Sequence, residues 1–325
     1  MQNEYRSKKA ASACWASVFM VLMVGGCVTV PFDSEIEHPP LWQIEKPDGS
    51  IMWLLGTVHW LPAAQQPDHW RLEIWLRHRR VNTGQPLPVP WNHGSVHTAI
   101  ENMQSLVIES IDQPTEAELL EVVSRVFVTD ECSDSSRSNP DSWRENLMTE
   151  NDSIPLIGKL FLMNESRSNP VQEADNVGLE YWLGTFAGLR GVPVFALENL
   201  ETRAHVVWAN LGHKSCEIQA ALMAQFEAVQ SEPRESQPEL PRAYALWRVG
   251  DIATLDQELR RFDRDDPELF RALVSGRNRF WIDFLLEHLD RPGNTLVAVG
   301  MAHLAGPDNL LQLLAEHDIE ARRVQ

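Results

Sequence analysis

Short apolar runs separated by long helical stretches limit what this chain can fold into. Residues 105–108, 193–197 and 295–299 have the length and the apolar content of buried β-strands. The sequence between these runs has the periodicity of amphipathic helices. This alternation predicts an α/β fold, in which a central mixed sheet is flanked by helices.

A β-hairpin is expected to open the sheet. Residues 41–45 and 51–55 are apolar runs on either side of a Lys-Pro-Asp-Gly-Ser segment. A Pro-Asp-Gly turn between two such runs indicates a hairpin. The folded domain is therefore predicted to begin at Leu41, and it is expected to extend to residue 324.

Apolar periodicity and capping residues predict helices along the rest of the domain. The expected ranges are 115–127, 171–189, 203–229, 251–262, 267–289 and 307–317. Gly191 is expected to end the second of these helices. Asp266 is expected to cap the fifth helix, with Pro267 as its first residue, and Pro307 to begin the last.

The first 27 residues have the parts of a secretion signal. Basic side chains precede an apolar run at residues 10–23, which closes on small residues before Cys27. This pattern predicts a signal peptide with a lipobox at residues 1–27, and Cys27 as the site of lipidation. An uncleaved anchor and an ordinary secretory peptide are the alternatives. Residues 28–40 are expected to be a tether that lifts the domain from the membrane.

The predicted location is therefore the cell envelope, with the lipid anchor in the outer membrane and the domain facing the periplasm. The net charge of -18 repels phosphate backbones and argues against a nucleic-acid partner. Once the signal peptide is removed and Cys27 is lipidated, Cys132 and Cys216 remain. Either a disulfide or two separate buried thiols is compatible with this pair.

Residues capable of catalysis or metal binding follow each of the main apolar runs. In chain order they are His59, Glu109, Glu198 and His303, and both histidines stand in Gly-x-x-His segments. Ligands of open α/β sheets bind beyond the carboxyl ends of the strands, so these side chains are expected to converge. Gly56 and Gly300 are expected to let the backbone turn sharply out of each strand.

Two imidazoles and one carboxylate match a catalytic metal site with an open position for water. His59, Glu109 and His303 would hold the ion, and either Glu109 or Glu198 would act as general base. The competing interpretation is structural, because a single histidine at a strand end more often bonds a carbonyl or caps a helix.

Further candidates are weaker. Arg277 lies in a predicted helix, where it would bind a substrate carboxylate or an oxyanion, or else face solvent. Asn278 beside it and Glu180 on another helix are additional candidates for the site. His93 and His97 have metal-like spacing, but the prolines before them predict a loop.

These motifs resemble those of the TraB/GumN family (TraB/PrgY/GumN), which includes the animal Tiki proteins. The segments that carry the resemblance are Leu41–Glu45, Leu54 to His59, Val107 to Glu109, Arg277-Asn278 with Trp281, and Val299 to Asp308. The resemblance implies an EreA/ChaN-like fold with two pseudo-repeated halves, in which the Gly-x-x-His turns face each other. It also implies a metal-dependent peptidase with His59, Glu109 and His303 at its centre and Arg277 and Glu198 as neighbours.

We therefore expect a metal-dependent hydrolase of the peptidase or amidase kind, which acts on a peptide substrate in the cell envelope. The expected cofactor is a divalent ion, manganese or cobalt by resemblance, with zinc as a further option. A metal-free hydrolase with the same residues is a close variant. A peptide- or pheromone-binding or conjugation-related regulatory lipoprotein, without turnover, is the alternative from another class, and a scaffold for envelope machinery is the third.

Overall fold

The computed structural model describes residues 38–58, 94–111, 115–127, 157–158, 161, 179–212 and 242–325. The predicted signal peptide, Cys27, most of the tether, His59, Cys132 and Cys216 lie outside the described residues. So do residues 171–178 and 213–229 of two predicted helices. None of the helices within the described ranges is long and apolar enough to cross a membrane.

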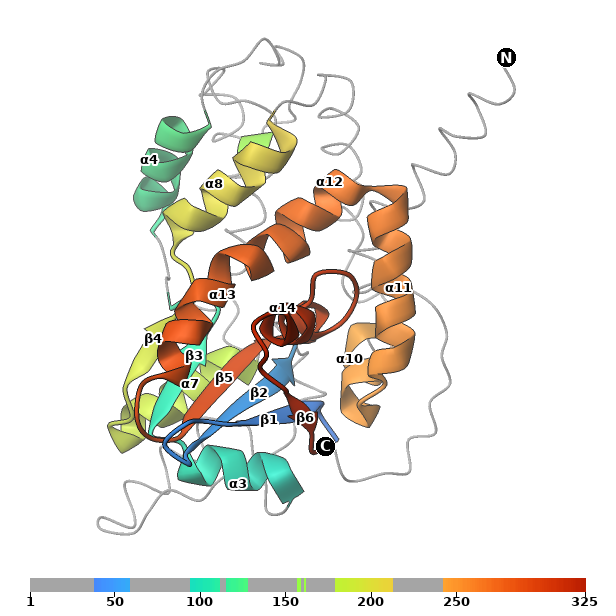
Figure 1. Ribbon diagram of the computed structural model, residues 1–325. Coiled ribbons are helices and arrows are strands. Elements are labelled where there is room, and N and C mark those ends of the chain that lie inside the picture. The colour runs from blue at the N-terminus through green and yellow to red at the C-terminus, as the bar shows by residue number, and fades with distance from the viewer. Residues whose placement is uncertain are drawn as a thin grey trace, which may run out of the picture.

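The described strands form a mixed sheet of the order β4-β3-β5-β2-β1-β6 (Figure 1). Their bounds are Leu41–Glu45 (β1), Ile51–Thr57 (β2), Ser105–Ile108 (β3), Val194–Ala196 (β4), Thr295–Gly300 (β5) and Arg322–Arg323 (β6). Strands β2, β5, β3 and β4 run parallel to one another, whereas β1 is antiparallel to both β2 and β6. The predicted hairpin is confirmed, with Leu41 opposite Leu55.

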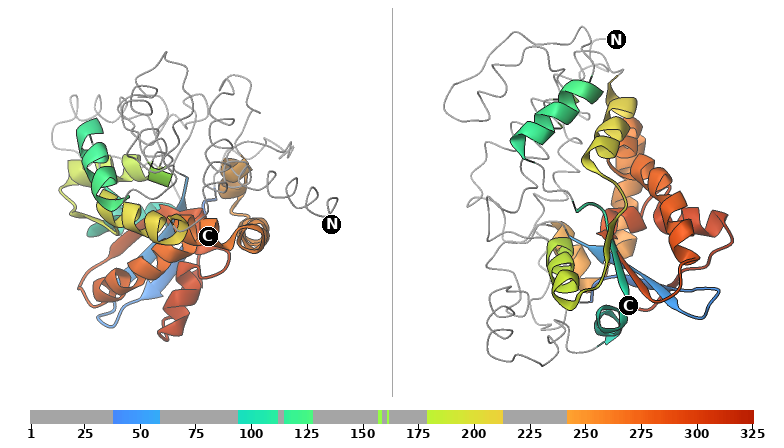
Figure 2. Two further views of the ribbon diagram at one scale, coloured as in Figure 1. Left: turned by 90° about the horizontal axis from the view of Figure 1, so that it is seen from above. Right: turned by 90° about the vertical axis from the view of Figure 1, so that its left-hand side faces the viewer.

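Each face of the sheet is covered by its own apolar layer. Trp53 and Leu55 of β2 belong to a cluster with α3, α7 and α11, while Met52 and Leu54 belong to a second cluster with α13 and α14. Figure 2 shows α13 and α14 on one side of the sheet and α7 on the other. Because both faces are buried, consecutive residues of a parallel strand are apolar, as Leu106 and Val107 of β3 show, instead of alternating with polar ones. The mixed α/β architecture expected from the sequence is thus observed.

The helices in the described ranges connect and cover these strands. Their bounds are Gly94–Asn102 (α3), Glu116–Val126 (α4), Leu179–Arg190 (α7), Leu200–Leu211 (α8), Arg242–Val249 (α10), Ile252–Asp265 (α11), Pro267–Phe270 (α12), Gly276–Leu289 (α13) and Leu310–Glu316 (α14). Helix α4 begins with a capping box between Thr115 and Glu118, and α12 has Asp266 as N-cap and Pro267 in its first turn. Helix α10 and strand β6 were not predicted.

Helix α3 corrects the prediction of a loop around His97. Its residues Val96, Ala99 and Ile100 recur at helical spacing and are buried against the sheet. The helix starts after the upstream prolines, so their helix-breaking effect does not reach it. His97 lies 3.3 Å from Glu101 one turn later, in an ordinary (i, i+4) pair.

Two predicted helix starts were also wrong. Helix α8 begins at Leu200 instead of residue 203, because the Asn199 side chain accepts a hydrogen bond from the backbone N–H of Thr202. Helix α14 begins at Leu310 instead of at Pro307. The intervening Asp308 has a φ of 50°, which is incompatible with a helix.

The predicted helix at residues 267–289 is continuous but not uniform. Arg271–Ser275 forms a π-helical turn (η4) between α12 and α13, and the N–H of Gly276 donates to the Arg271 carbonyl five residues earlier. Such a turn inserts an extra residue and rotates the helix that follows. Arg277 and Asn278 come directly after it, so the turn sets the direction in which both side chains leave α13.

Candidate functional site

The carboxyl ends of the parallel strands bring the predicted residues together. Glu109 follows β3, Glu198 comes two residues after β4, and His303 lies in a 3₁₀ turn (η5, Met301–Leu304) directly after β5. Arg277 reaches the same place from α13, within hydrogen-bond distance of both glutamates. The site is therefore built from segments that are almost 200 residues apart in the chain, since Gly300 N–H donates to Glu109 across 191 positions.

Arg277 is the central cation of this site. Its Nη2 donates to Glu109 Oε2 at 2.6 Å and to Glu198 Oε1 at 2.7 Å, and its Nε lies 3.1 Å from Glu198 Oε1. The guanidinium carbon stacks over the Trp281 ring at 4.7 Å. Burial alone would lower the pKa of Arg277, but the charges of Glu198 and Glu109 outweigh it and raise the pKa above its ordinary value. The side chain therefore stays charged.

Glu198 is enclosed by donors. Its side chain is 0% exposed, and its Oε2 accepts a hydrogen bond from Trp281 Nε1 at 3.0 Å. Arg203 Nε lies 3.1 Å from Oε1, which Arg277 also contacts. Two guanidinium groups and an indole thus surround one carboxylate, an arrangement that holds Arg277 in a fixed orientation.

Glu109 is held at both oxygens. Oε1 accepts a hydrogen bond from the Gly300 N–H at 2.7 Å, and Oε2 accepts from Arg277. The backbone carbonyl of Glu109 accepts from the N–H of Glu198 at 3.0 Å, so β3 and β4 stay paired up to the site. The carboxylate therefore has a defined position at the end of β5.

His303 lies against the same residues. Its Nδ1 is 2.7 Å from Asn278 Oδ1, and its Nε2 is 3.4 Å from Arg277 Nη1 and 3.5 Å from Glu109 Oε1. The imidazole packs against Trp281, with ring centroids 4.5 Å apart. Only 4% of the side chain is exposed, so the ring is held in one orientation.

The two glycines that were expected to end their strands differ. Gly56 lies inside β2, which continues to Thr57, whereas Gly300 is the last residue of β5 and directly precedes the 3₁₀ turn η5. A Cβ on Gly56 would be 2.8 Å from Pro40 Cγ and 3.1 Å from Met301 Cβ, so glycine permits close packing there. The Gly56 carbonyl accepts a hydrogen bond from the buried Trp247 Nε1 at 2.7 Å.

Glu180 lies at the end of β2, next to the segment that leads to His59. The Thr57 hydroxyl donates to Glu180 Oε1, and the N–H of Leu179 donates to the Val58 carbonyl at 3.1 Å. Helix α7 is thereby fastened to the last described residue before His59. His59 itself lies outside the described residues, and its role as a metal ligand stays a prediction.

The donor set can be tested against the predicted metal ion. Two ligands of a tetrahedral ion with bonds near 2.1 Å are separated by about 3.4 Å. His303 Nε2 and Glu109 Oε1 are 3.5 Å apart, and the opposite nitrogen of His303 is held by an amide oxygen, as in many metal sites. The separation of these two atoms is therefore that of two ligands of one ion, and the cationic Arg277 Nη1 lies 3.4 Å from the same nitrogen. Among the residues with described positions, no group of three His, Cys, Asp or Glu side chains is arranged for a metal.

Sequence reasoning missed two contributors to this site. Trp281 was named only as part of the family resemblance and was given no role in the site, yet its indole N–H binds Glu198 and its ring contacts both Arg277 and His303. Its position four residues after Arg277 places it on the same helix face, which was the available signal. The backbone carbonyl of Asp308, which binds Asn278, left no signal of this kind in the sequence.

The fold and the site define an α/β protein with a buried His, Glu and Arg cluster at the carboxyl edge of its sheet. A family model described as TraB/PrgY/gumN family matches residues 89–323. The chain therefore belongs to the TraB/PrgY/gumN family, and the match includes Glu109, Glu198, Arg277 and His303. Searches among curated proteins and among solved structures returned no match.

Proposed function

We propose that this protein is a metal-dependent hydrolase of the peptidase or amidase kind. The observation that carries the proposal is the 3.5 Å separation of His303 Nε2 and Glu109 Oε1. Such a spacing suits two ligands of one ion, and a catalytic site of this class needs a third protein ligand. His59 is the proposed third ligand, because it comes two positions after Thr57, the last residue of β2, which is paired with Gly300 of β5.

The residues of the chain would divide the work as follows. A divalent ion, when bound, supplies an activated water and polarises a carbonyl group. Glu109 would hold the ion through Oε1 and would accept the proton of the attacking water through its other oxygen, Oε2. Arg277 would place positive charge beside the developing oxyanion through Nη1, which lies 3.4 Å from His303 Nε2. Glu198 would keep Arg277 in place instead of acting as the base, because donors surround both of its oxygens.

The envelope location and the architecture are part of the same proposal. We place the domain, residues 41–324, on a tether behind a lipid on Cys27, where peptides of the periplasm are accessible. We further propose the EreA/ChaN-like fold with two pseudo-repeated halves. Its support is the position of Gly56 and Gly300, which lie one residue out of register on neighbouring parallel strands.

A second candidate function is peptide binding without turnover. The observation that favours it is the charge balance of the cluster, in which Arg277 and Arg203 offset Glu109 and Glu198. A site with balanced charges attracts a metal cation less than an open carboxylate cluster does. A metal-free hydrolase with His303 and Glu109 as the acid-base pair is the intermediate case.

Metal content after loading tests the proposal. The full-length chain would be loaded with manganese, cobalt or zinc, desalted, and measured by elemental analysis beside a His59→Ala/His303→Ala variant. A His288→Phe variant is the control, since His288 is also buried but lies next to Lys46 at the other end of the strands. We expect about one ion per chain in the wild type and control, and none in the double variant.

Either departure from this pattern is informative. Equal metal content in the wild type and the double variant would refute the site. Absence of metal from both, combined with peptide cleavage that survives chelation, would establish the metal-free hydrolase. Absence of metal together with intact recovery of a bound peptide would establish the binding protein.

A further inference from the structure

Asn278 joins the imidazole of His303 to the loop that follows it. Asn278 is fully buried, and its Oδ1 lies 2.7 Å from His303 Nδ1. Its Nδ2 donates to the backbone carbonyl of Asp308 at 2.9 Å. The two ends of one amide therefore contact two groups with different hydrogen-bonding character.

The Asp308 carbonyl determines how the amide is oriented. A backbone carbonyl oxygen only accepts hydrogen bonds, so the end of Asn278 that faces it must be the NH₂ group. The amide oxygen then faces His303 Nδ1. Because an amide oxygen also only accepts, Nδ1 must carry the hydrogen. In a neutral imidazole the lone pair then belongs to Nε2.

The surroundings of Nε2 agree with this assignment. Arg277 Nη1 lies 3.4 Å away and is only a donor, so it favours a lone pair on Nε2. Glu109 Oε1 is an acceptor and would favour a hydrogen there, but at 3.5 Å it is beyond normal hydrogen-bond length. The much shorter contact of Asn278 with Nδ1 decides the tautomer.

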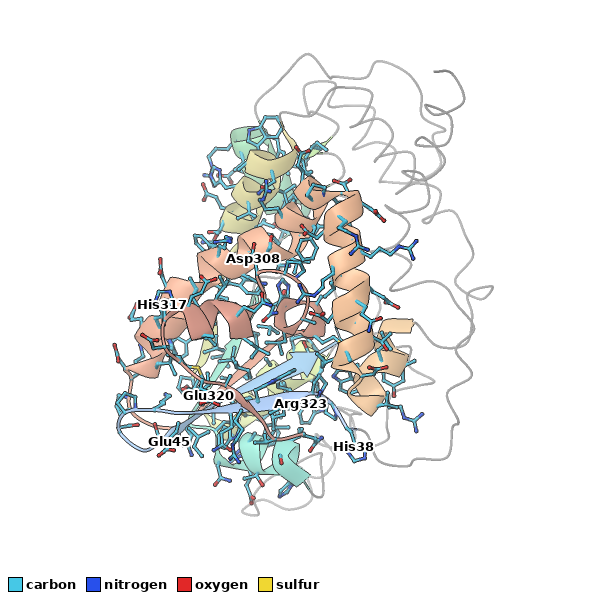
Figure 3. The ribbon with its side chains drawn as sticks, turned by 45° about the vertical axis from the view of Figure 1, so that its right-hand side comes forward. His38, Glu45, Asp308, His317, Glu320 and Arg323 are labelled. Carbon is cyan, nitrogen blue, oxygen red and sulfur yellow. The ribbon has the colours of Figure 1, made fainter. Side chains whose placement is uncertain are left out.

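The loop that supplies the carbonyl is itself held in place. Gly306 and Asp308 have φ values of 78° and 50°, and the Gly306 N–H donates to Asp256 Oδ1 of α11 at 2.9 Å. Arg279 on α13 lies 2.9 Å from the Asp308 carboxylate. Figure 3 labels Asp308 in this loop, ahead of α14. The left-handed backbone at Asp308, its ion pair with α13 and the contact of Gly306 with α11 fix the direction of the Asp308 carbonyl.

We propose that Asn278, oriented by the Asp308 carbonyl, is a positioning residue that sets the tautomer of His303. The hydrogen is on Nδ1, and Nε2 presents its lone pair toward Glu109 and Arg277. The use of this lone pair as a metal ligand or base rests on the proposed function. The tautomer itself does not, so it can be measured whether or not metal binds.

The ring nitrogens report the tautomer directly. The full-length chain would be labelled with ¹⁵N-histidine, treated with chelator, and studied by NMR at about pH 8, where imidazoles are neutral. A His303→Gln variant identifies the His303 signals among the 11 histidines. Asn278→Leu and Asn278→Ala are both prepared, so that one folded variant without the amide is sufficient.

Asn309→Ala is the matched control. Asn309 is a second buried asparagine and lies in the loop itself, where its side chain donates to the Gly306 carbonyl and caps α14. Loss of Asn309 loosens the loop but leaves the Asn278 amide in place. The Asn309→Ala variant therefore separates the effect of a looser loop from the effect of losing the Asn278–His303 hydrogen bond.

In the wild type and in Asn309→Ala we expect the His303 ring to carry its hydrogen on Nδ1 and none on Nε2. In the Asn278 variants the ratio of the two tautomers should shift about fivefold toward the Nε2–H form, which corresponds to the loss of one hydrogen bond. A wild-type ring with hydrogen on Nε2, or on both nitrogens, would overturn the proposal. An unchanged tautomer in a folded Asn278 variant would overturn it as well. Metal content measured on a separate loaded sample tests the proposed function independently.

Discussion

Removal of the central cation is the perturbation with the largest calculable effect. In Arg277→Met the side chain keeps much of its length and its contact with Trp281, but the bonds of 2.6 and 2.7 Å to Glu109 and Glu198 are lost. The Glu198 side chain is 0% exposed, so water cannot replace the missing donor. Breaking a buried ion pair by removal of one partner costs about 3–5 kcal/mol in free energy of unfolding.

Urea unfolding of the full-length chain at pH 7, followed by circular dichroism, measures this loss. Arg279→Met is the matched control, because Arg279 is two residues away on α13 and its ion pair with Asp308 is solvent-exposed. We expect the control to stay within about 1 kcal/mol of the wild type. In the double variant Arg277→Met/Glu198→Gln one of the two carboxylates that lost Arg277 is neutral, and part of the stability should return. A loss below about 1 kcal/mol in Arg277→Met would refute the buried-pair argument.

Three other predictions concern stability away from this ion pair. Lys46→Met should lower the free energy of unfolding by about 3 kcal/mol in urea, because the buried ammonium has its three donors within 2.8 to 3.3 Å of three carbonyls and a hydroxyl. An unchanged midpoint would contradict this. Burial, with the nearby positive charges of Arg291 and Lys46, lowers the pKa of His288 from 6.5 to about 4. Below pH 6.5 the unfolded chain therefore binds a proton that the folded chain does not, and stability should fall by about 3 kcal/mol between pH 6.5 and 4 through this group. The free energy of unfolding, measured across that pH range, should therefore fall more steeply in the wild type than in His288→Phe. Parallel curves of unfolding free energy against pH would contradict this. Gly56→Ala should lower the free energy of unfolding by about 1–3 kcal/mol, because its Cβ would lie 2.8 Å from Pro40 Cγ. Gly188→Ala has open space around the new Cβ and should be neutral or stabilising. Equal effects of the two substitutions would argue against close packing at Gly56.

The strands were predictable because their signals are local. The Pro-Asp-Gly turn specifies the hairpin, and strands buried on both faces are short apolar runs. Their order is not a local property. Strand β5 lies between β2 and β3, although it begins almost 240 residues after β2 and almost 190 after β3, and no local pattern in the chain indicates that neighbour relation. Helix starts failed for a related reason, since Asn199 and Asn309 act as caps only in a particular backbone conformation.

The site was predictable in position but not in its bonding. Side chains that follow parallel strands share one edge of the sheet, so Glu109, Glu198 and His303 were expected to meet, and they do. The sequence did not indicate that Arg277 bonds both glutamates, because the π-helical turn before it rotates α13 relative to a regular helix. The role of Asn278 depends on the φ of Asp308, which no residue pattern specifies.

X-ray absorption of the zinc- or manganese-loaded chain measures whether His303 and Glu109 coordinate an ion. We expect imidazole scattering at about 2.0–2.2 Å from the metal, reduced in His303→Ala and unchanged in His288→Phe. A spectrum without imidazole scattering, or one that His303→Ala leaves unchanged, would contradict it.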